Sequence, residues 1–239
     1  MKVPTYKEFD DYYDLAMRSL LEEGRVPVSI ADIMRKRLEF EPGVLEEGVN
    51  WWGRHATGDA LAHVGHSFVF KILPRSDYLL NIPEKNFTQL QRHKLGYSRS
   101  DYSQGSIPIT KDEFKRMPSQ EISWLLPGDR GPNTIYVRGD DLCGRDFSES
   151  GVLNNPVWRF VVNDENLLKN YVEKVFSLVK NTPAMRVHLI KKDSSDKYGV
   201  FALEIFDLDC VSGLGTQGVY NFCFPLIGKF PSENKGLTQ

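Results

Sequence analysis

Cysteines are few in this chain of 239 residues, and their placement argues against two classes of small protein. The three cysteines, Cys143, Cys210 and Cys223, are odd in number and far apart in the sequence. Such a set is not typical of a disulfide framework or of a compact zinc knuckle. We therefore expect reduced thiols that are partly buried.

Long apolar runs are also missing. No run approaches the roughly 18 residues that a membrane-spanning helix needs. The first residues, from Met1 to Tyr6, lack the apolar stretch of a secretory signal. The sequence therefore predicts a soluble, cytoplasmic protein without membrane contact, and it gives no indication of the oligomeric state.

An excess of charge of either sign is absent as well. Thirty lysines and arginines stand against 32 aspartates and glutamates, so the formal net charge is −2. Such a chain has no overall field that would draw it onto nucleic acid or an anionic membrane, so any contact with nucleic acid must be local. Hydrophobic residues at 41% and charged residues at 26% are typical of a globular protein, which argues against extensive disorder.

The common nucleotide and metalloprotease motifs do not occur. The sequence contains no GxxxxGK[ST], GxGxxG or HExxH pattern and no internal repeat. Asp101 with Glu113 and Lys115 formally matches a nuclease signature. However, Thr110 and Glu113 have the spacing of a helix-capping box, so Glu113 is expected to cap a backbone amide instead of binding a metal.

The first half of the chain is expected to be mainly helical. Apolar residues recur three and four positions apart over residues 5–23 and again over residues 29–40. Ser29 is expected to cap the second of these helices, with Asp32 three residues on. The segment from residue 57 is predicted to begin as a helix. Residues 64–73 either continue that helix or form a buried strand, because periodicity does not separate the two. Residues 83–109, rich in polar residues, predict a mobile basic loop.

The second half carries strand patterns around one strong helix. Residues 134–137 and 157–162 are rich in β-branched and aromatic residues, which favours strands. Asn163 is expected to cap a helix that runs to Lys180 and covers a sheet. Residues 186–191 and 199–208 are joined by a polar turn too short for a crossover helix, so they predict an antiparallel pair, followed by a third run at 219–227.

These patterns predict an α+β fold. It has a mainly helical N-terminal half and an antiparallel β-sheet with one covering helix in the C-terminal half. The expected organisation is a helix-rich region over residues 1–130 and a sheet region over residues 131–230, packed as a single domain. Residues 231–239 are polar and predict a frayed tail.

The densest cluster of reactive side chains lies between Gly53 and Phe68 and holds three of the five histidines. On a helix, His55, Asp59 and His63 would share one face, and His66 would lie one turn beyond His63. Imidazole and carboxylate groups bind zinc or iron and can leave a coordination position for water. The interpretation is a divalent metal site (Zn or Fe), and the alternative is a helix whose histidines are solvent-exposed or hydrogen-bonded.

Two further segments are candidate substrate sites. The basic loop provides cations and aromatic residues that could bind phosphate or stack bases, unless it is simply a solvated surface loop. The tryptophan pair just before the histidine cluster could cover a pocket or pack into the core. The predicted substrate-binding residues are Lys85, Arg92, Lys94, Arg99, Trp51 and Trp52.

Glu204 is the most unusual carboxylate in the predicted sheet. Strand alternation places it on the same face as Val200, Ala202 and Phe206, which is an apolar face. A buried carboxylate needs a partner or becomes protonated. His188 and Arg186 are the expected partners, and Glu204 and His188 are the predicted catalytic residues. The alternative is an edge position with Glu204 in solvent.

Together these patterns favour a metal-assisted hydrolase that acts on an anionic, phosphate-bearing substrate. The alternative is a binding or assembly protein without catalysis, which contacts a protein or nucleic-acid partner through Trp51, Trp52 and the basic loop at residues 85–99. Its ligand would be a small anion or a nucleic acid.

Overall fold

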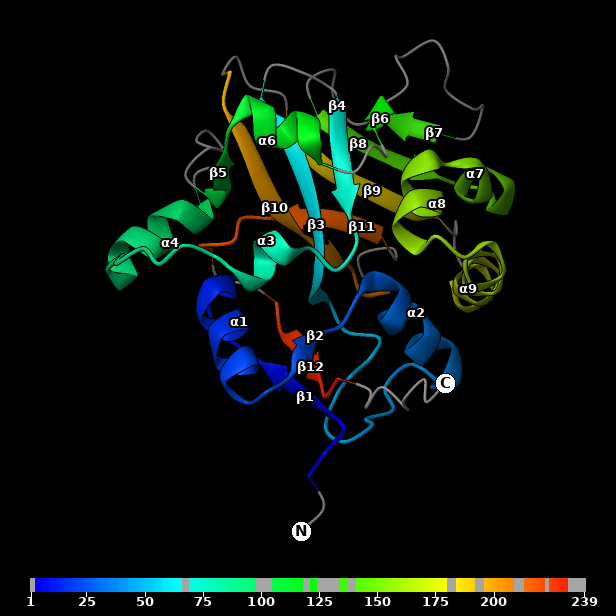
Figure 1. Ribbon diagram of the computed structural model, residues 1–239. Coiled ribbons are helices and arrows are strands. Elements are labelled where there is room, and N and C mark those ends of the chain that lie inside the picture. Colours follow the sequence, from blue (N-terminus) through cyan, green and yellow to red (C-terminus); the bar gives the residue numbers. More distant parts are fainter. Residues whose placement is uncertain are drawn as a thin grey trace, which may run out of the picture.

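The structure is a computed structural model of the whole chain. It describes residues 3–65, 69–97, 105–117, 121–123, 134–136, 141–179, 184–191, 196–208, 213–221 and 224–231. One mixed β-sheet crosses the molecule, with helices on both sides (Figure 1). Its main path has the order β1-β12-β3-β10-β11-β9-β8-β7.

The strands of this sheet come from both halves of the chain. They are β1 (Tyr6–Phe9), β2 (Val26–Pro27), β3 (His55–Val64), β4 (Val69–Leu73), β5 (Ile107–Ile109), β6 (Glu121–Ser123), β7 (Thr134–Tyr136), β8 (Asp141–Asp146), β9 (Met185–Lys191), β10 (Tyr198–Ile205), β11 (Gly213–Gln217) and β12 (Leu226–Lys229).

The helices gather in two groups on either side of the central strands (Figure 1). The first group is α1 (Tyr13–Glu22), α3 (Asp77–Leu80), α4 (Gln89–Tyr97) and α6 (Lys111–Arg116). The second group is α2 (Ile30–Glu39), α7 (Glu149–Asn154), α8 (Pro156–Val162) and α9 (Glu165–Leu178). Within the residues that the structure describes, no helix is both long and apolar enough to cross a membrane.

The expected helical N-terminal half is wrong, because β3 is a central strand of the sheet. All ten of its residues are buried, and it pairs antiparallel with both β4 and β10. A strand buried on both faces shows no alternation of polar and apolar residues, so its sequence cannot be told from that of a buried helix.

The predicted antiparallel sheet of the C-terminal half is also wrong in its order. β11 lies between β9 and β10, antiparallel to β10 and parallel to β9. The sheet is therefore mixed. The predicted strand at 157–162 is instead α8, which has Pro156 in its first turn and Asn155 as its N-cap. The segment predicted as a basic loop contains α4 and β5.

Several local expectations are confirmed. Ser29 and Asp32 form a capping box at the start of α2, and Thr110 and Glu113 form one at the start of α6. The long amphipathic helix is α9, although Asp164 is its N-cap and Asn163 ends α8 in the left-handed conformation, with φ of 48°. Capping chemistry is local, so it can be recognised from a few neighbouring residues.

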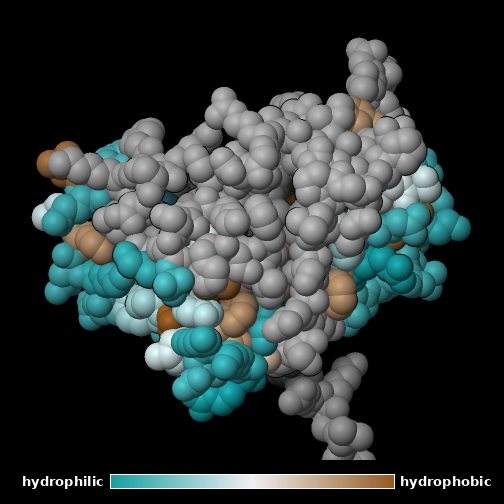
Figure 2. Space-filling view, turned by 90° about the horizontal axis from the view of Figure 1, so that it is seen from above, coloured by the Kyte–Doolittle hydropathy of each residue, from teal (hydrophilic) through white to brown (hydrophobic). Residues whose placement is uncertain are grey.

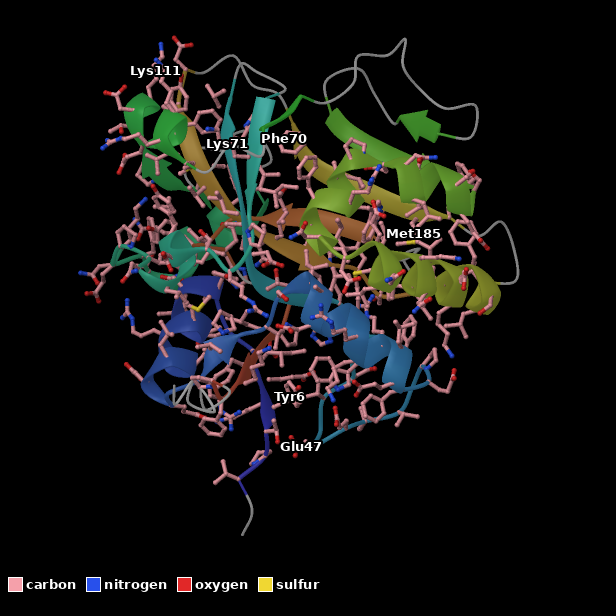
Figure 3. The ribbon with its side chains drawn as sticks, turned by 45° about the vertical axis from the view of Figure 1, so that its right-hand side comes forward. Tyr6, Glu47, Phe70, Lys71, Lys111 and Met185 are labelled. Carbon is pink, nitrogen blue, oxygen red and sulfur yellow. The ribbon has the colours of Figure 1, made fainter. Side chains whose placement is uncertain are left out.

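The hydrophobic core lies on both faces of the sheet. On β10, Leu203 and Ile205 belong to the cluster that includes residues of α2, α8 and α9. Val200 and Ala202, which point to the other face, belong to the cluster that includes residues of α1. Met185, at the start of β9, belongs to the first cluster and lies close to α9 (Figure 3). Glu204 shares the face of Val200 and Ala202 but belongs to neither cluster.

Candidate functional site

The predicted metal ligands lie on a strand, which separates them. Positions four apart on a strand are about 13 Å apart, because each residue advances about 3.3 Å. His55, Asp59 and His63 therefore do not converge as they would on a helix. Across the described part of the chain, no three side chains of the metal-binding types come together. His66 lies outside the described residues.

His55 is held as a buried, neutral side chain. Its Nε2 lies 2.7 Å from the carbonyl oxygen of Asn50. Burial lowers its pKa to about 4, and the nearby charge of Arg37 adds to this effect. His55 therefore joins the loop before β3 to the strand and carries no charge near neutral pH.

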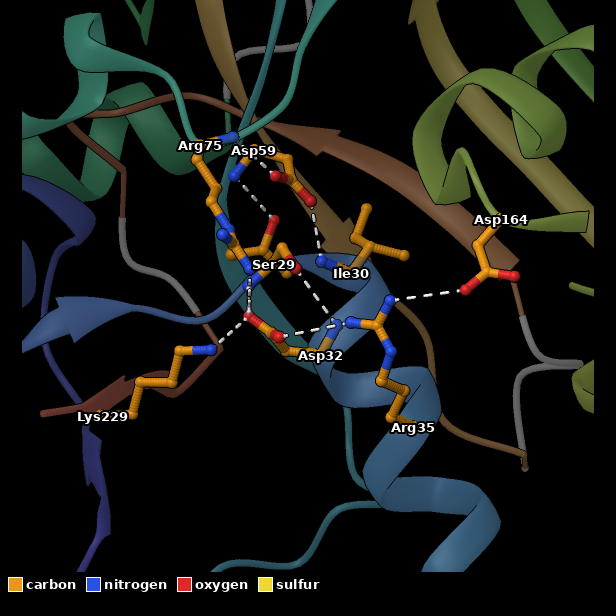
Figure 4. Close-up of polar contacts among 9 residues, drawn as sticks. Ser29, Ile30, Asp32, Arg35, Asp59, Arg75, Asp164 and Lys229 are labelled. Atoms are coloured by element: carbon orange, nitrogen blue, oxygen red, sulfur yellow. Dashed lines mark hydrogen bonds and ion pairs between the residues drawn. The ribbon is translucent and has the colours of Figure 1, made fainter. Parts of the chain in front are cut away.

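Asp59 is a buried carboxylate that accepts two backbone hydrogen bonds. Its Oδ2 accepts from the amide of Ile30 at 2.7 Å, and its Oδ1 accepts from the amide of Arg75 at 2.9 Å (Figure 4). A register shift between β3 and β10 interrupts the ladder between Ala56 and Ala60, next to Asp59. Burial raises its pKa to about 6 against these hydrogen bonds. The carboxylate thus joins β3 to the first turn of α2 and to the turn after β4.

Asp32 forms a second, more exposed polar cluster beside Asp59 (Figure 4). Its Oδ2 accepts from the backbone of Ser29 at 3.1 Å and from Lys229 Nζ at 2.9 Å. Burial acts to raise the pKa of Asp32, but the hydrogen bonds from Lys229 and Ser29 outweigh it and lower the pKa. The charges in this cluster are matched, so it stabilises the start of α2.

The tryptophan pair is part of the core, so the predicted Trp51/Trp52 contact surface is wrong. Both residues are buried. Trp51 Nε1 donates to Glu46 at 2.9 Å, and Trp52 Nε1 donates to the carbonyl of Phe40 at 2.7 Å. Trp52 also stacks on Tyr171 of α9. Their ring faces are therefore not available to a ligand.

Arg37, which sequence reasoning passed over, is a fully buried cation among these aromatic rings. It donates from Nε to Trp51 O at 2.7 Å, from Nη2 to Gly53 O at 2.7 Å and from Nη1 to Tyr171 Oη at 2.6 Å. The signal was present in the sequence, because residue 37 continues the apolar face of α2 at positions 30, 33 and 34.

The predicted basic segment forms one wall of a groove against α1. The groove has a volume of about 390 Å³ and lies between the start of α1 and residues 84–92. Lys85 and Arg92 from the prediction line it, whereas the side chain of Lys94 is not described and Arg99 lies outside the described residues. Tyr12 and Phe87 provide aromatic walls.

The two predicted cations in this groove have different roles. Arg92 is buried and makes two hydrogen bonds to the Asp14 carboxylate, at 2.7 and 3.1 Å. Lys85 takes part in no side-chain hydrogen bond or ion pair within the described part of the chain. Its Nζ lies 4.3 Å from the centre of the Tyr220 ring, and partial burial lowers its pKa. Arg92 is thus structural, and Lys85 is open to a ligand.

Glu204 is buried as expected, but its partner is Arg54. Two hydrogen bonds join them: Arg54 Nη2 to Oε1 at 2.7 Å, and Arg54 Nε to Oε2 at 3.2 Å. Burial raises the pKa of Glu204, and the charges of Arg54 and then Arg186 oppose that rise. His188, the other predicted catalytic residue, lies two strands away on β9, with Gly215 of β11 between them in register, and its side chain is not described.

No protein-family model matches the sequence, and no curated protein matches it. One similar solved structure is reported as "Accommodation of massive sequence variation in Nanoarchaeota by the C-type lectin fold". The TM-score is 0.56 and the sequence identity 15%, and the match covers 94% of this chain and 96% of that chain. At this identity the likeness shows the fold alone, so the chain shares the C-type lectin fold.

The metal-assisted hydrolase predicted from the sequence is therefore wrong. It required a helix that would bring His55, Asp59 and His63 together, whereas these residues lie on a central strand of a C-type lectin fold. The groove and the Arg54–Glu204 pair are two other places where charged side chains gather. The cytoplasmic location stays a prediction.

Proposed function

We propose that this chain is a non-catalytic binding protein, and that the groove between α1 and residues 84–92 holds a segment of a protein partner. The observation that carries the proposal is Lys85. Its ammonium group lies in a groove beside two aromatic rings, Tyr220 and Phe87, and has no carboxylate partner among the described residues. A carboxylate from a partner would fill that place.

The size and lining of the groove support this proposal. Its volume of about 390 Å³ falls within the range of known ligand sites, roughly 300 to 1,000 Å³. Aromatic walls supply contact area at a small entropy cost. Seen from above, the coloured residues of the surface are mostly hydrophilic with scattered hydrophobic ones (Figure 2), so this face has no broad apolar area among them.

The charges of the groove favour a polypeptide over a nucleic acid. Two carboxylates, Asp11 and Glu84, line it together with Arg18, Lys85 and Arg92. Arg92 is already neutralised by Asp14, which lies beneath the groove. A phosphate backbone would meet these carboxylates as well as the cations, whereas a peptide carries charges of both signs.

The fold comparison supports a scaffold role. The similar structure is reported as accommodating massive sequence variation in the C-type lectin fold. A framework that keeps its core while surface residues change is suited to recognition, because loops on a rigid scaffold carry binding residues.

The test is a selection of random heptapeptides on the purified protein, followed by fluorescence polarisation with the enriched peptides. We expect the enriched peptides to contain an acidic residue. Lys85→Gln should weaken their binding by about tenfold, because one charge-assisted hydrogen bond is lost. The matched control is Lys111→Gln. Lys111 lies at the outer end of α6, lines no part of the groove, and should leave binding unchanged (Figure 3).

Two outcomes would overturn the proposal. One is that no peptide is enriched above the level of an unrelated protein. The other is that the enriched peptides bind Lys85→Gln as well as the unaltered chain. A random oligonucleotide serves as a second probe, and binding that falls steeply with salt and disappears in Lys85→Gln would assign the groove to nucleic acid instead.

A further inference from the structure

A second basic site lies on the sheet face that carries Glu204, apart from the groove. Glu204 is opposite Gly215 of β11, and Gly213 of β11 is opposite Arg186 of β9. The amide of Phe206 donates to Gly213 O at 2.8 Å. Directly opposite positions on paired strands share a face of the sheet. Glu204, Phe206 and Arg186 therefore surround two glycines on one face.

We call Gly213 and Gly215 the glycine floor, because the missing side chains leave room above the sheet. A Cβ atom on Gly215 would lie 2.6 Å from Phe206 Cζ and 2.7 Å from Glu204 Oε1. A Cβ atom on Gly213 would lie 2.9 Å from Phe206 Cδ2. The Phe206 ring and the Glu204 carboxyl group thus pack directly against the glycine floor. In this position the Phe206 ring contacts both Arg54 and Arg186.

The charges around the glycine floor do not balance. Arg54 is paired with Glu204, and its guanidinium carbon lies 4.4 Å from the centre of the Phe206 ring. That of Arg186 lies 4.7 Å from the same ring. Arg186 is half-buried, its Nε is buried without a partner, and its guanidinium group makes no hydrogen bond within the described part of the chain.

Such an arrangement is unfavourable without a further group. A buried donor without an acceptor loses its hydrogen bonds to water. An oxyanion would supply the acceptor, because the forked guanidinium group matches a carboxylate or phosphate with two parallel hydrogen bonds. We propose that Arg186 anchors a binding site for an oxyanion, a carboxylate or phosphate group, beside the glycine floor.

The test measures the thermal midpoint of the full chain by scanning fluorimetry, with sodium phosphate or sodium acetate titrated against sodium chloride of equal ionic strength. We expect one of the two oxyanions to raise the midpoint above the chloride control, which also tells phosphate from carboxylate. Arg186→Gln should weaken that apparent affinity by about tenfold or more. Arg186→Lys, which keeps the charge but loses the fork, should bind with intermediate affinity.

The matched control is Arg159→Gln, because Arg159 is an exposed arginine of α8 paired with Glu165. Helix α8 packs with Met185 and Val187, which lie on the face of β9 opposite to that of Arg186. Arg159→Gln should keep the full response, and so should Lys85→Gln, which separates this site from the groove. The proposal is overturned if neither oxyanion exceeds chloride. It is also overturned if Arg186→Gln responds as the unaltered chain does. If Arg186→Gln does not fold, Arg186→Lys takes its place in the test. A response of Arg186→Lys equal to that of the unaltered chain then overturns the proposal.

Discussion

Asp59 on β3 and Lys85 in the groove are both charged side chains next to the protein interior, but only one of them is satisfied by the chain itself. Asp59 is fully buried and accepts two backbone hydrogen bonds. Lys85 is partly exposed, and within the described part of the chain its ammonium group interacts with aromatic rings and with no carboxylate. The histidines and the aspartate of β3 were predicted to bind a metal because of their residue types, yet the polar atoms of His55 and Asp59 stabilise the fold. The unpaired cation is the better indicator of a ligand.

The same contrast separates Arg37 from Arg186. Arg37 has no carboxylate partner among the described residues either, but three neutral oxygen atoms accept hydrogen bonds from its N–H groups. Among the described residues, Arg186 donates no hydrogen bond, and its Nε is buried. Charge and burial are therefore insufficient to identify a site, and the hydrogen bonds that the chain itself provides must be counted first.

The largest expected effect concerns Arg37. Arg37→Met should lower the free energy of unfolding by on the order of 3 kcal/mol, because three acceptors, two of them in buried hydrogen bonds, lose their donors at once. Urea denaturation followed by tryptophan fluorescence would measure it. The control, Arg35→Met, changes an exposed arginine of the same helix and should cost no more than about 0.5 kcal/mol. Equal stability of the two variants would contradict a structural role for Arg37.

A smaller effect is expected from the titration of Asp59. Its folded pKa, about 6, lies above its ordinary value of 3.8. The folded protein therefore holds this proton more tightly than the unfolded chain. The stability contributed in this way is complete below pH 3.8 and is lost as the pH rises through 6.

We therefore expect the stability of the unaltered chain to fall by roughly 2 to 3 kcal/mol relative to Asp59→Asn between about pH 3.5 and pH 7. Urea denaturation of both proteins at several pH values would measure the difference. The comparison removes the contributions of titrating groups that do not interact with Asp59. A difference that does not change with pH would mean that the pKa of Asp59 is not raised.

The smallest effect is expected for Lys85 itself. Lys85→Gln should change the free energy of unfolding by no more than about 1 kcal/mol, because only the cation–π contacts are lost. Thermal and urea unfolding without a ligand would measure it. A loss of unfolding free energy as large as that of Arg37→Met would show that Lys85 stabilises the fold. Lys85 would then no longer differ from Asp59 of β3 in its role.

The parts of the fold that sequence reasoning predicted are those set by local chemistry. The capping boxes of α2 and α6 and the amphipathic stripe of α9 depend on residues within a few positions of each other. The place of β11 between β9 and β10 depends on contacts far apart in the sequence, which no local pattern encodes. Strand β3 was predicted as a helix for the same reason, because its pairing with β4 and β10 is not encoded in a local pattern.

The candidate site was predictable in part for the same reason. The burial of Glu204 follows from strand alternation, and alternation needs only the strand itself. Its partner did not follow, because Arg54 precedes β3, which pairs with β10 only in the folded sheet. Lys85 was predicted as a binding residue because its segment is rich in basic residues. Only the structure shows that Asp14 pairs with Arg92 and that Lys85 has no such partner among the described residues.

The pairing of β3 with β10 has a consequence for the speed of folding. Ala60 and Ala202 are directly opposite each other, although about 140 residues separate them in the chain. The chain must lose the entropy of closing this long loop before the hydrogen bonds of the central ladder can stabilise it. Sheets built from distant pairings therefore fold slowly. The helices capped by their own neighbours can form early. The strands at the centre of the sheet, the most buried part of the molecule, are then among the last to be completed.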